Sequence, residues 1–295
     1  MMFSGLSAFP ITPANEAGEV DIRELAGLLE RLKIPGVGSV GLLGSTGTFA
    51  YLSRSERRRA VDVAVEVLNR DVPLIVGVGA LRTDEACAHA RDAKAAGADA
   101  LLMAPVSYTP LTQEEAYQHY KAVASVTDLP LCIYNNPGTT HFTFDLDLLV
   151  RLAALDTVSA VKMPLPAARS LGEDLEVLRA ALPAEFAVGY SGDWGCGEAL
   201  LCGADTWYSV IGGLLPELAA SLAQAARRGD EVGARRIDMK LAPFWALFKE
   251  FGSLRVVYAA AGQMGLTTCS LPRPLLPLER DAESRVAAAL ETLAD

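Results

Sequence analysis

The sequence predicts an α/β fold, a (β/α)8 TIM barrel followed by a C-terminal helical extension. Short apolar runs alternate with helical patterns from the N-terminus to beyond residue 210, and eight of these runs have strand length. Most of the runs are apolar on both faces, which is typical of parallel strands that helices cover on the outside. The 295-residue chain is long enough, since a barrel of this kind needs roughly 200–250 residues. An open, doubly wound parallel sheet is the alternative.

The expected strands are short and spread along the chain. They cover residues 6–11, 37–43, 74–78, 98–103, 131–134, 158–162, 186–190 and 206–211. Between them, capping residues mark where helices begin. Asp21 with Glu24 predicts a capping box, Ser53 with Glu56 predicts a second start, and Thr112 with Glu115 predicts another. Helical patterns also cover about residues 83–96 and 144–153.

The barrel is expected to end near Ala226. The eighth strand and its helix are complete there, so residues 1–226 are expected to form the barrel and residues 227–295 the helical extension. Pro272, Pro274 and Pro277 interrupt the helical pattern of the extension. No linker rich in glycine, serine or charge separates the two parts, so no independent second domain is expected.

The composition argues against several kinds of partner. A net charge of −10 disfavours nucleic acid and anionic membrane surfaces, because both attract clustered Lys and Arg. The one dense basic run, Arg57-Arg58-Arg59, falls in a helical pattern and is expected on a solvated face. No apolar run reaches membrane-spanning length, and the N-terminus lacks a signal-peptide pattern. Five cysteines without C-x-x-C spacing are typical of reduced core residues in a cytoplasmic protein.

Neither a nucleotide cofactor nor a metal is predicted. Residues 36–41 match G-x-G-x-x-G, but a dinucleotide motif follows a strand and opens a helix, whereas these glycines lead into an expected strand. The three histidines, His89, His119 and His141, have no metal-ligand spacing. The expected partner is therefore a small molecule that binds without a cofactor.

Lys162 has an unusual position for a lysine. It ends the apolar run 158–162, where a side chain is expected to be partly buried. Burial disfavours an ammonium ion and leaves a population of neutral, nucleophilic amine that can attack a carbonyl. A lysine at a strand end can instead extend its ammonium group to solvent. Tyr134 ends the preceding run, so its phenol and the Lys162 amine are expected to meet at one mouth of the barrel.

Two polar stretches follow other strands. Gly44-Ser45-Thr46-Gly47 comes after the second expected strand, at the end where barrel enzymes carry their sites. Two hydroxyls between two glycines can offer donors to a small anion such as a carboxylate, although such turns are common and the motif alone is weak. Asp193, after the seventh strand, is interpreted as a cap for the helix that follows.

Several strand-end motifs occur together in the order of one known family. F-P-I-T-P starts at Phe9, G-S-T-G at Gly44, T-Q-E-E-A-Y at Thr112, Y-N-N-P at Tyr134 and V-K-M at Val161. From Gly5 to about Pro216, the chain resembles the dihydrodipicolinate synthase / N-acetylneuraminate lyase family. The resemblance implies a TIM barrel with a C-terminal helical extension, usually tetrameric. It also implies class I aldolase chemistry on pyruvate or another 2-keto acid.

The resemblance assigns roles to individual residues. Lys162 falls on the Schiff-base lysine, and Tyr134 on the tyrosine that relays protons. Ser45 takes the place of the hydroxyl that links this tyrosine into a relay. Thr46, with Gly47 beside it, takes the place of the donor to the keto-acid carboxylate. Imine formation needs a neutral amine and a proton shuttle, so these residue types fit the implied chemistry.

Several positions depart from the family pattern. Thr48 stands where the family has Glu, and Thr139 stands where the synthase has the Arg that binds the carboxylate of its second substrate. Tyr108 is expected to fill the place of a relay tyrosine that acts across a subunit interface. Tyr208 lies in a segment that is normally aliphatic and could add a hydroxyl to the pocket. We therefore expect a family member other than the lysine-biosynthesis synthase.

Two functions are compatible with these observations. The first is a lyase, aldolase or dehydratase that acts on pyruvate or another 2-keto acid, such as a 2-keto-3-deoxy sugar acid, through an imine at Lys162. The second is a non-catalytic barrel that binds a keto acid as a sensor or serves as a scaffold. The missing arginine at Thr139 keeps the second open, whereas retention of Lys162, Tyr134 and Thr46 together favours the enzyme. A homo-oligomer is expected, and the resemblance implies a tetramer.

Overall fold

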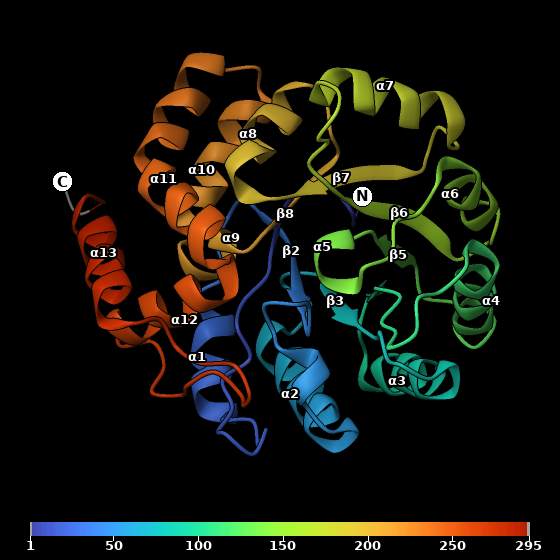
Figure 1. The fold of residues 1–295 in the computed structure, drawn as a ribbon, viewed down its shortest axis with the longest axis horizontal. Coiled ribbons are helices and arrows are strands. Elements are labelled where there is room, and N and C mark those ends of the chain that lie inside the picture. The colour runs from blue at the N-terminus through green and yellow to red at the C-terminus, as the bar shows by residue number, and fades with distance from the viewer. Residues whose placement is uncertain (1, 294–295) are drawn as a thin grey trace.

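Eight parallel strands close into a barrel in the order in which they occur along the chain. The structure is a computed structural model that describes residues 2–293 (Figure 1). The strands are β1 (Gly5–Ala8), β2 (Val37–Leu42), β3 (Leu74–Gly77), β4 (Ala100–Met103), β5 (Leu131–Tyr134), β6 (Val158–Pro164), β7 (Ala187–Ser191) and β8 (Thr206–Ser209). Since β8 also pairs with β1, the predicted TIM barrel is confirmed and the open sheet is wrong.

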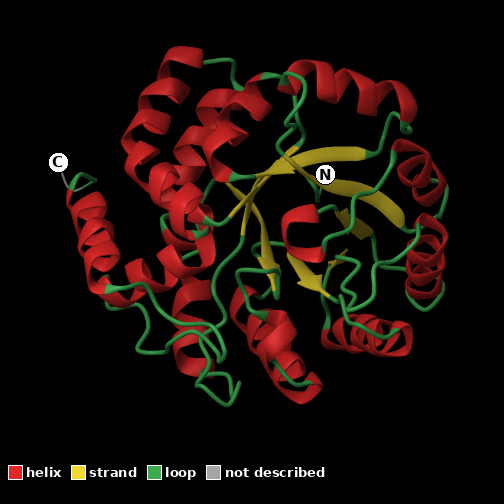
Figure 2. Ribbon diagram, in the orientation of Figure 1, coloured by secondary structure: helices red, strands yellow, loops and turns green. Residues whose placement is uncertain are grey.

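Helices surround the barrel on the outside (Figure 2). Those that follow the strands are α1 (Ile22–Glu30), α2 (Arg54–Leu68), α3 (Thr83–Ala96), α4 (Gln113–Ala124), α6 (Leu146–Ala153), α7 (Leu171–Ala181), α8 (Asp193–Leu201) and α10 (Pro216–Arg227). Short turns of helix, namely η1 (Phe49–Tyr51), α5 (Pro137–Thr140) and α9 (Ile211–Leu214), lie in the connections after the strands. Helix α1, for example, turns an apolar stripe inward with Leu25, Leu28 and Leu29.

Three further helices, α11 (Glu231–Phe251), α12 (Ser253–Gln263) and α13 (Arg280–Glu291), follow the barrel. Figure 1 shows them together at one side of the molecule, where α11 packs against α8 and α10. The expected boundary at residue 226 falls at the end of α10. Tyr258 on α12 donates a hydrogen bond of 3.1 Å to the carbonyl oxygen of Thr12, which ties the extension to the loop after β1.

The first helix begins at the predicted residue but with a different capping pattern. Asp21 is the N-cap of α1 and accepts hydrogen bonds from two backbone N–H groups. Glu24 does not complete the predicted capping box, because Thr267 and Thr268 of the C-terminal segment donate hydrogen bonds to its carboxylate. The other two predicted helix starts are observed, and α4 begins with its predicted capping box.

The prediction of a solvated face for the whole basic run in α2 is wrong for one of its residues. Arg57 is buried and donates hydrogen bonds to the carbonyl oxygens of Gly77 (2.8 Å) and Gly79 (3.0 Å) at the end of β3. Burial lowers the pKa of Arg57 to about 10. Arg58 and Arg59 lie on the expected solvated face, where they form ion pairs with Asp62 and Glu56 of the same helix. Arg57 therefore fastens α2 to the mouth of the barrel.

The barrel interior combines small side chains with a few large rings. Ala160 on β6 and Ala187 on β7 belong to the same interior cluster as Phe9, Tyr134 and Tyr208. Small residues on some strands leave space for aromatic residues that enter from others, because every inward-facing side chain shares one narrow interior. This packing decides which rings surround the strand-end lysine.

The remaining sequence expectations concern cysteines and membranes. Cys87, Cys132 and Cys196 are buried core residues as predicted, whereas Cys202 is exposed. None of the five cysteines forms a disulfide in residues 2–293. Within the same range, no helix is both long and apolar enough to cross a membrane.

Candidate active site

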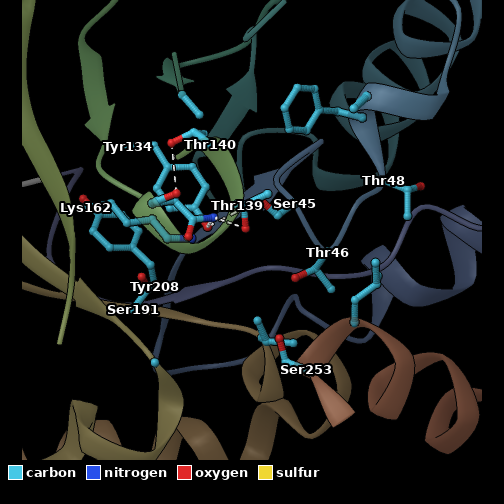
Figure 3. A pocket seen from close by; sticks show the side chains of 18 of the residues that line it. Ser45, Thr46, Thr48, Tyr134, Thr139, Thr140, Lys162, Ser191, Tyr208 and Ser253 are labelled. Carbon is cyan, nitrogen blue, oxygen red and sulfur yellow. Dashed lines mark hydrogen bonds between the residues drawn. The ribbon is translucent and has the colours of Figure 1, made fainter. Parts of the chain in front are cut away.

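A cavity of about 530 Å³ opens at the carboxyl ends of the strands. Its walls come from the segments after β2, β4, β5, β7 and β8, and from Lys162 within β6. The extension also contributes, through Phe248 on α11 and Ser253 and Leu254 on α12. Figure 3 shows Ser253 on the opposite wall from Lys162 and Tyr134. The C-terminal helices therefore complete the cavity that the barrel begins.

Lys162 is 3% exposed, and its Nζ atom lies among aromatic rings. The register of β5 and β6 places Tyr134 directly beside Lys162. The distance from Nζ to the ring centroid is 4.1 Å for Tyr134 and 4.1 Å for Phe9. A third ring, that of Tyr208, has its centroid 5.6 Å from Nζ. The amine is thus buried and still reaches the cavity, so the expected meeting of Lys162 and Tyr134 is observed.

The hydroxyl oxygen of Tyr134 has two neighbours that donate to it. The side-chain amide of Asn136 donates a hydrogen bond of 3.0 Å, and the hydroxyl of Ser45 lies at 3.5 Å in donating geometry. Because both neighbours offer protons to this oxygen, the proton of Tyr134 remains available to a molecule in the cavity. Asn136 also donates to Thr139 Oγ1 at 3.0 Å. Asn136 was not among the predicted site residues, although it lies within the Y-N-N-P motif.

The turn after β2 brings two of its predicted residues to the cavity and leaves one outside. Ser45 and Thr46 line the cavity, and Thr46 is buried. Gly47 does not line it. A Cβ atom at Gly47 would lie 2.9 Å from Thr12 Oγ1 and 3.0 Å from the backbone of Leu43, so the turn leaves little room for a side chain at this position. Leu43 and Thr48 bracket the turn with φ angles of 57° and 51°, a strained conformation that tertiary packing holds in place.

The two other predicted tyrosines have different environments. Tyr208 lines the cavity with its ring, but its hydroxyl lies 3.4 Å from Cys132 Sγ and is turned into the barrel. Burial raises the pKa of Tyr208, so the phenol stays protonated. Tyr108 is 97% exposed and does not line the cavity of its own chain. A part for Tyr108 in the relay therefore depends on contact with another copy of the chain.

Asp193 is not the predicted helix cap. Gly192 is the N-cap of α8, whereas Asp193 is 2% exposed, lines the cavity and reaches across to β8. Its carboxylate accepts hydrogen bonds from Trp207 Nε1 at 2.6 Å and from the backbone N–H groups of Val210 and Ile211 at 3.1 and 3.0 Å. Burial raises the pKa of Asp193, and the hydrogen bonds from Ile211 and Trp207 oppose the rise. Asp193 therefore holds the segment after β8 in place.

The lining of the cavity carries little charge. Among the described residues, Lys162 is the only cationic side chain that lines the cavity, and Asp193 is the only acidic one. Hydroxyl groups supply most of the other polar lining, from Ser45, Thr46, Thr48, Ser107, Thr139, Thr140, Ser191 and Ser253. Thr139 lines the cavity where the synthase pattern has arginine.

Only one group of metal-ligating side chains is found in residues 2–293, and it does not line the cavity. Asp21, Glu24 and Cys269 place ligand atoms within 4.8 Å of one another. Thr267 and Thr268 already donate hydrogen bonds to the Glu24 carboxylate, and burial raises the pKa of Cys269 to about 11. The hydrogen bonds to Glu24 account for this arrangement without an ion.

The closed barrel and the buried lysine that β6 directs into its cavity define the class of protein. The chain belongs to the Dihydrodipicolinate synthetase family, whose model matches residues 2–293. The family model therefore matches the C-terminal extension as well, whereas the motif resemblance covered only Gly5 to about Pro216. The chain is therefore an enzyme of the dihydrodipicolinate synthase / N-acetylneuraminate lyase type.

Particular relatives are similar along nearly the whole chain. A 4-hydroxy-tetrahydrodipicolinate synthase of Neisseria meningitidis serogroup B is 31% identical, over 98% of both chains. A solved dihydrodipicolinate synthase of Agrobacterium tumefaciens is 58% identical with a TM-score of 0.97, covering 99% of this chain and 98% of that one. A chloride-inhibited dihydrodipicolinate synthase of Acinetobacter baumannii, solved in complex with pyruvate, is 30% identical with a TM-score of 0.91, covering 100% and 99%.

Proposed function

We propose that this enzyme is a lyase that forms an imine between Lys162 and pyruvate or another 2-keto acid. The observation that carries the proposal is that the Lys162 amine and the Tyr134 hydroxyl face the same cavity, while Ser45 and Asn136 both donate to the Tyr134 oxygen. A nucleophilic amine with an adjacent proton-carrying hydroxyl is the arrangement that imine formation requires. The pyruvate complex of the similar A. baumannii enzyme supports a keto acid as ligand.

The proposed reaction uses the residues in a fixed order. The Lys162 amine attacks the keto carbon, and the oxygen takes up protons and leaves as water, giving a cationic imine. Tyr134 carries these protons, with Ser45 as its hydrogen-bonded neighbour. Thr46 binds the keto-acid carboxylate and so orients the substrate. The cationic imine then accepts the electron pair of a breaking carbon–carbon bond, or assists loss of a proton and then of a hydroxyl group as water.

The substrate is proposed to have an uncharged tail. Beyond Lys162 and Asp193 the cavity lining offers hydroxyl groups and apolar surface, and Thr139 offers no positive charge to a second carboxylate. Hydroxyl side chains can donate to and accept from the hydroxyl groups of a sugar acid. A 2-keto-3-deoxy sugar acid fits this lining better than aspartate semialdehyde does.

The test is reductive trapping with a panel of 2-keto acids. Incubation with pyruvate or the true keto acid and borohydride should add one reduced adduct, and peptide mapping should locate it at Lys162. Lys162→Arg should abolish the adduct, because the guanidinium stays protonated and cannot attack. An adduct at another residue, or none with any keto acid of the panel, would contradict the proposal. Trapping without turnover of any substrate would instead favour the keto-acid-binding scaffold.

The proposed assembly is a homotetramer in which Tyr108 acts in a neighbouring subunit. Its support is the full exposure of Tyr108 in the single chain, together with the family resemblance. Sedimentation analysis should detect an oligomer, and Tyr108→Phe should lower turnover without changing that oligomer. A fully active monomer would contradict a part for Tyr108 in the relay.

A further inference from the structure

The reactive nitrogen lies between three aromatic rings from different parts of the barrel. Phe9 follows β1, Tyr134 ends β5 and Tyr208 lies in β8, and their centroids are 4.1, 4.1 and 5.6 Å from Lys162 Nζ. The rings of Phe9 and Tyr208 also contact each other edge to face, at a centroid distance of 6.1 Å. All three residues are buried. We call Phe9, Tyr134 and Tyr208 the aromatic enclosure.

Neighbouring glycines make room for these rings. A Cβ atom at Gly41 would lie 2.2 Å from Phe9 Cζ, and one at Gly44 would lie 2.7 Å from Phe9 Cδ1. A Cβ atom at Gly189 would lie 2.6 Å from Tyr208 Cε2. The rings therefore occupy positions that a side chain on β2 or β7 would otherwise fill, and packing leaves them little freedom to move.

Two members of the enclosure can act only through their ring faces. Phe9 has no polar group and does not line the cavity, so it contacts the nitrogen from the barrel interior and not the substrate. The hydroxyl of Tyr208 is directed to Cys132 at 3.4 Å. Proton transfer is thus left to Tyr134. A ring face with negative electrostatic potential attracts a cation within about 6 Å, and more strongly when water is excluded.

We propose that Phe9 and Tyr208 stabilise the cationic imine on Lys162 relative to the neutral carbinolamine that precedes it. This inference rests on the proposed function, since it concerns an intermediate of that reaction. Conversion of the neutral carbinolamine to the imine takes up one proton, which Tyr134 delivers to the departing hydroxyl group. That group leaves as water, and a positive charge remains on the nitrogen. The enclosure faces that charge. No carboxylate forms an ion pair with Lys162 among the described residues. The Asp193 carboxylate lines the same cavity, but it already accepts hydrogen bonds from Trp207, Val210 and Ile211. The rings thereby shift bound keto acid toward the reactive form.

The experiment compares the two bound forms directly. With pyruvate labelled with carbon-13 at the keto carbon, NMR distinguishes the imine from the carbinolamine on the enzyme. Incorporation of trifluorophenylalanine at Phe9 keeps the shape of the ring and weakens its negative face. The ratio of imine to carbinolamine should fall by roughly two- to thirtyfold. The same residue incorporated at Phe244, a buried phenylalanine of α11 that does not line the cavity, should leave the ratio unchanged.

Tyr208 provides a second comparison. Tyr208→Phe keeps the ring face and should preserve the ratio, whereas Tyr208→Leu removes the face and should lower it. An unchanged ratio with fluorinated Phe9, or an equal loss in both Tyr208 variants, would overturn the inference while leaving the imine itself intact. If the unmodified enzyme forms no imine with any 2-keto acid, it is the proposed function that fails.

Discussion

The side-chain amide of Asn136 donates a hydrogen bond of 3.0 Å to the hydroxyl oxygen of Tyr134. An amide nitrogen can only donate, so this contact leaves the Tyr134 proton directed away from Asn136. The second hydrogen of the same amide is held by Thr139 Oγ1 at 3.0 Å, which fixes the amide in this orientation. Asn136 is therefore a residue that orients the proposed proton relay without contacting the reacting nitrogen.

The first prediction concerns this orientation. Asn136→Asp keeps the size of the side chain but replaces the donor with a carboxylate, which would accept the Tyr134 proton and turn it away from the cavity. We expect the turnover number to fall by about tenfold or more, because the relay loses a hydrogen bond and gains a competing acceptor. The keto-acid concentration for half-maximal trapping should change little. Steady-state kinetics and trapping together check this, and normal turnover would show that Asn136 has no part in the relay.

The second prediction separates proton transfer from binding. Tyr134→Phe keeps the ring beside Lys162 and removes only the hydroxyl. Turnover should fall by roughly 10²–10⁴, as for a lost acid–base group, while slow trapping at Lys162 persists. Ser45→Ala should show the same pattern more weakly.

Thr46→Val is the matched variant for binding. It removes a hydroxyl that lines the cavity and keeps the shape of the side chain. The keto-acid concentration needed for trapping should rise with little further loss in turnover at saturation.

The contrary outcome for the hydroxyl of Tyr134 is equally clear. If Tyr134→Phe turned over normally, the proton relay would have to be assigned to another group.

The third prediction concerns the second substrate. Thr139 lines the cavity without charge, so aspartate semialdehyde should be a poor partner for pyruvate. A charge-assisted contact is worth roughly 1.5–3 kcal/mol, so its absence should weaken binding by about ten- to a hundredfold. Thr139→Arg should recover part of this loss for the charged aldehyde and not for an uncharged one. Synthase activity of the unaltered enzyme at biosynthetic rates would contradict the prediction.

The fourth prediction concerns stability in acid. Burial, together with the charge of nearby Arg57, lowers the pKa of His89 from its usual 6.5 to about 4, although Asp92 partly opposes this. In the unfolded chain the His89 imidazole binds a proton below pH 6.5, whereas in the folded chain it binds one only below about pH 4. The contribution of the neutral imidazole to the free energy of unfolding is therefore fully present above pH 6.5 and is lost as the pH falls from 6.5 to about 4. Solvent screens part of this effect because His89 is only partly buried, so the contribution lost by pH 5 is on the order of 1 kcal/mol.

Denaturant unfolding at pH 7.5 and pH 5 measures this contribution. His89→Gln removes the titrating group, so its loss of stability over the same interval should be smaller than that of the unaltered protein. Equal losses in both proteins would show that other groups cause the acid sensitivity.

Local sequence pattern was sufficient for the barrel and for the centre of the site. Each strand needs only a short apolar run and each helix an apolar stripe with a cap, and both are written in consecutive residues. Parallel strands in a closed barrel place all their carboxyl ends at one mouth, so Lys162 and Tyr134 at the ends of adjacent strands had to be neighbours. The same rule brought Ser45 and Thr46 to the cavity.

Tertiary structure alone decided which side chains converge from distant strands. Asp193 resembles a helix cap in sequence, yet its carboxylate accepts a hydrogen bond from Trp207 on the next strand. Arg57 resembles a surface charge in sequence, yet it donates a hydrogen bond to a carbonyl oxygen at the end of β3. Phe9 reaches Lys162 across the barrel because Gly41 and Gly44 leave space for its ring. Gly47 lies beside the cavity without lining it. Such contacts depend on volumes and directions inside a shared interior, and consecutive residues do not encode them.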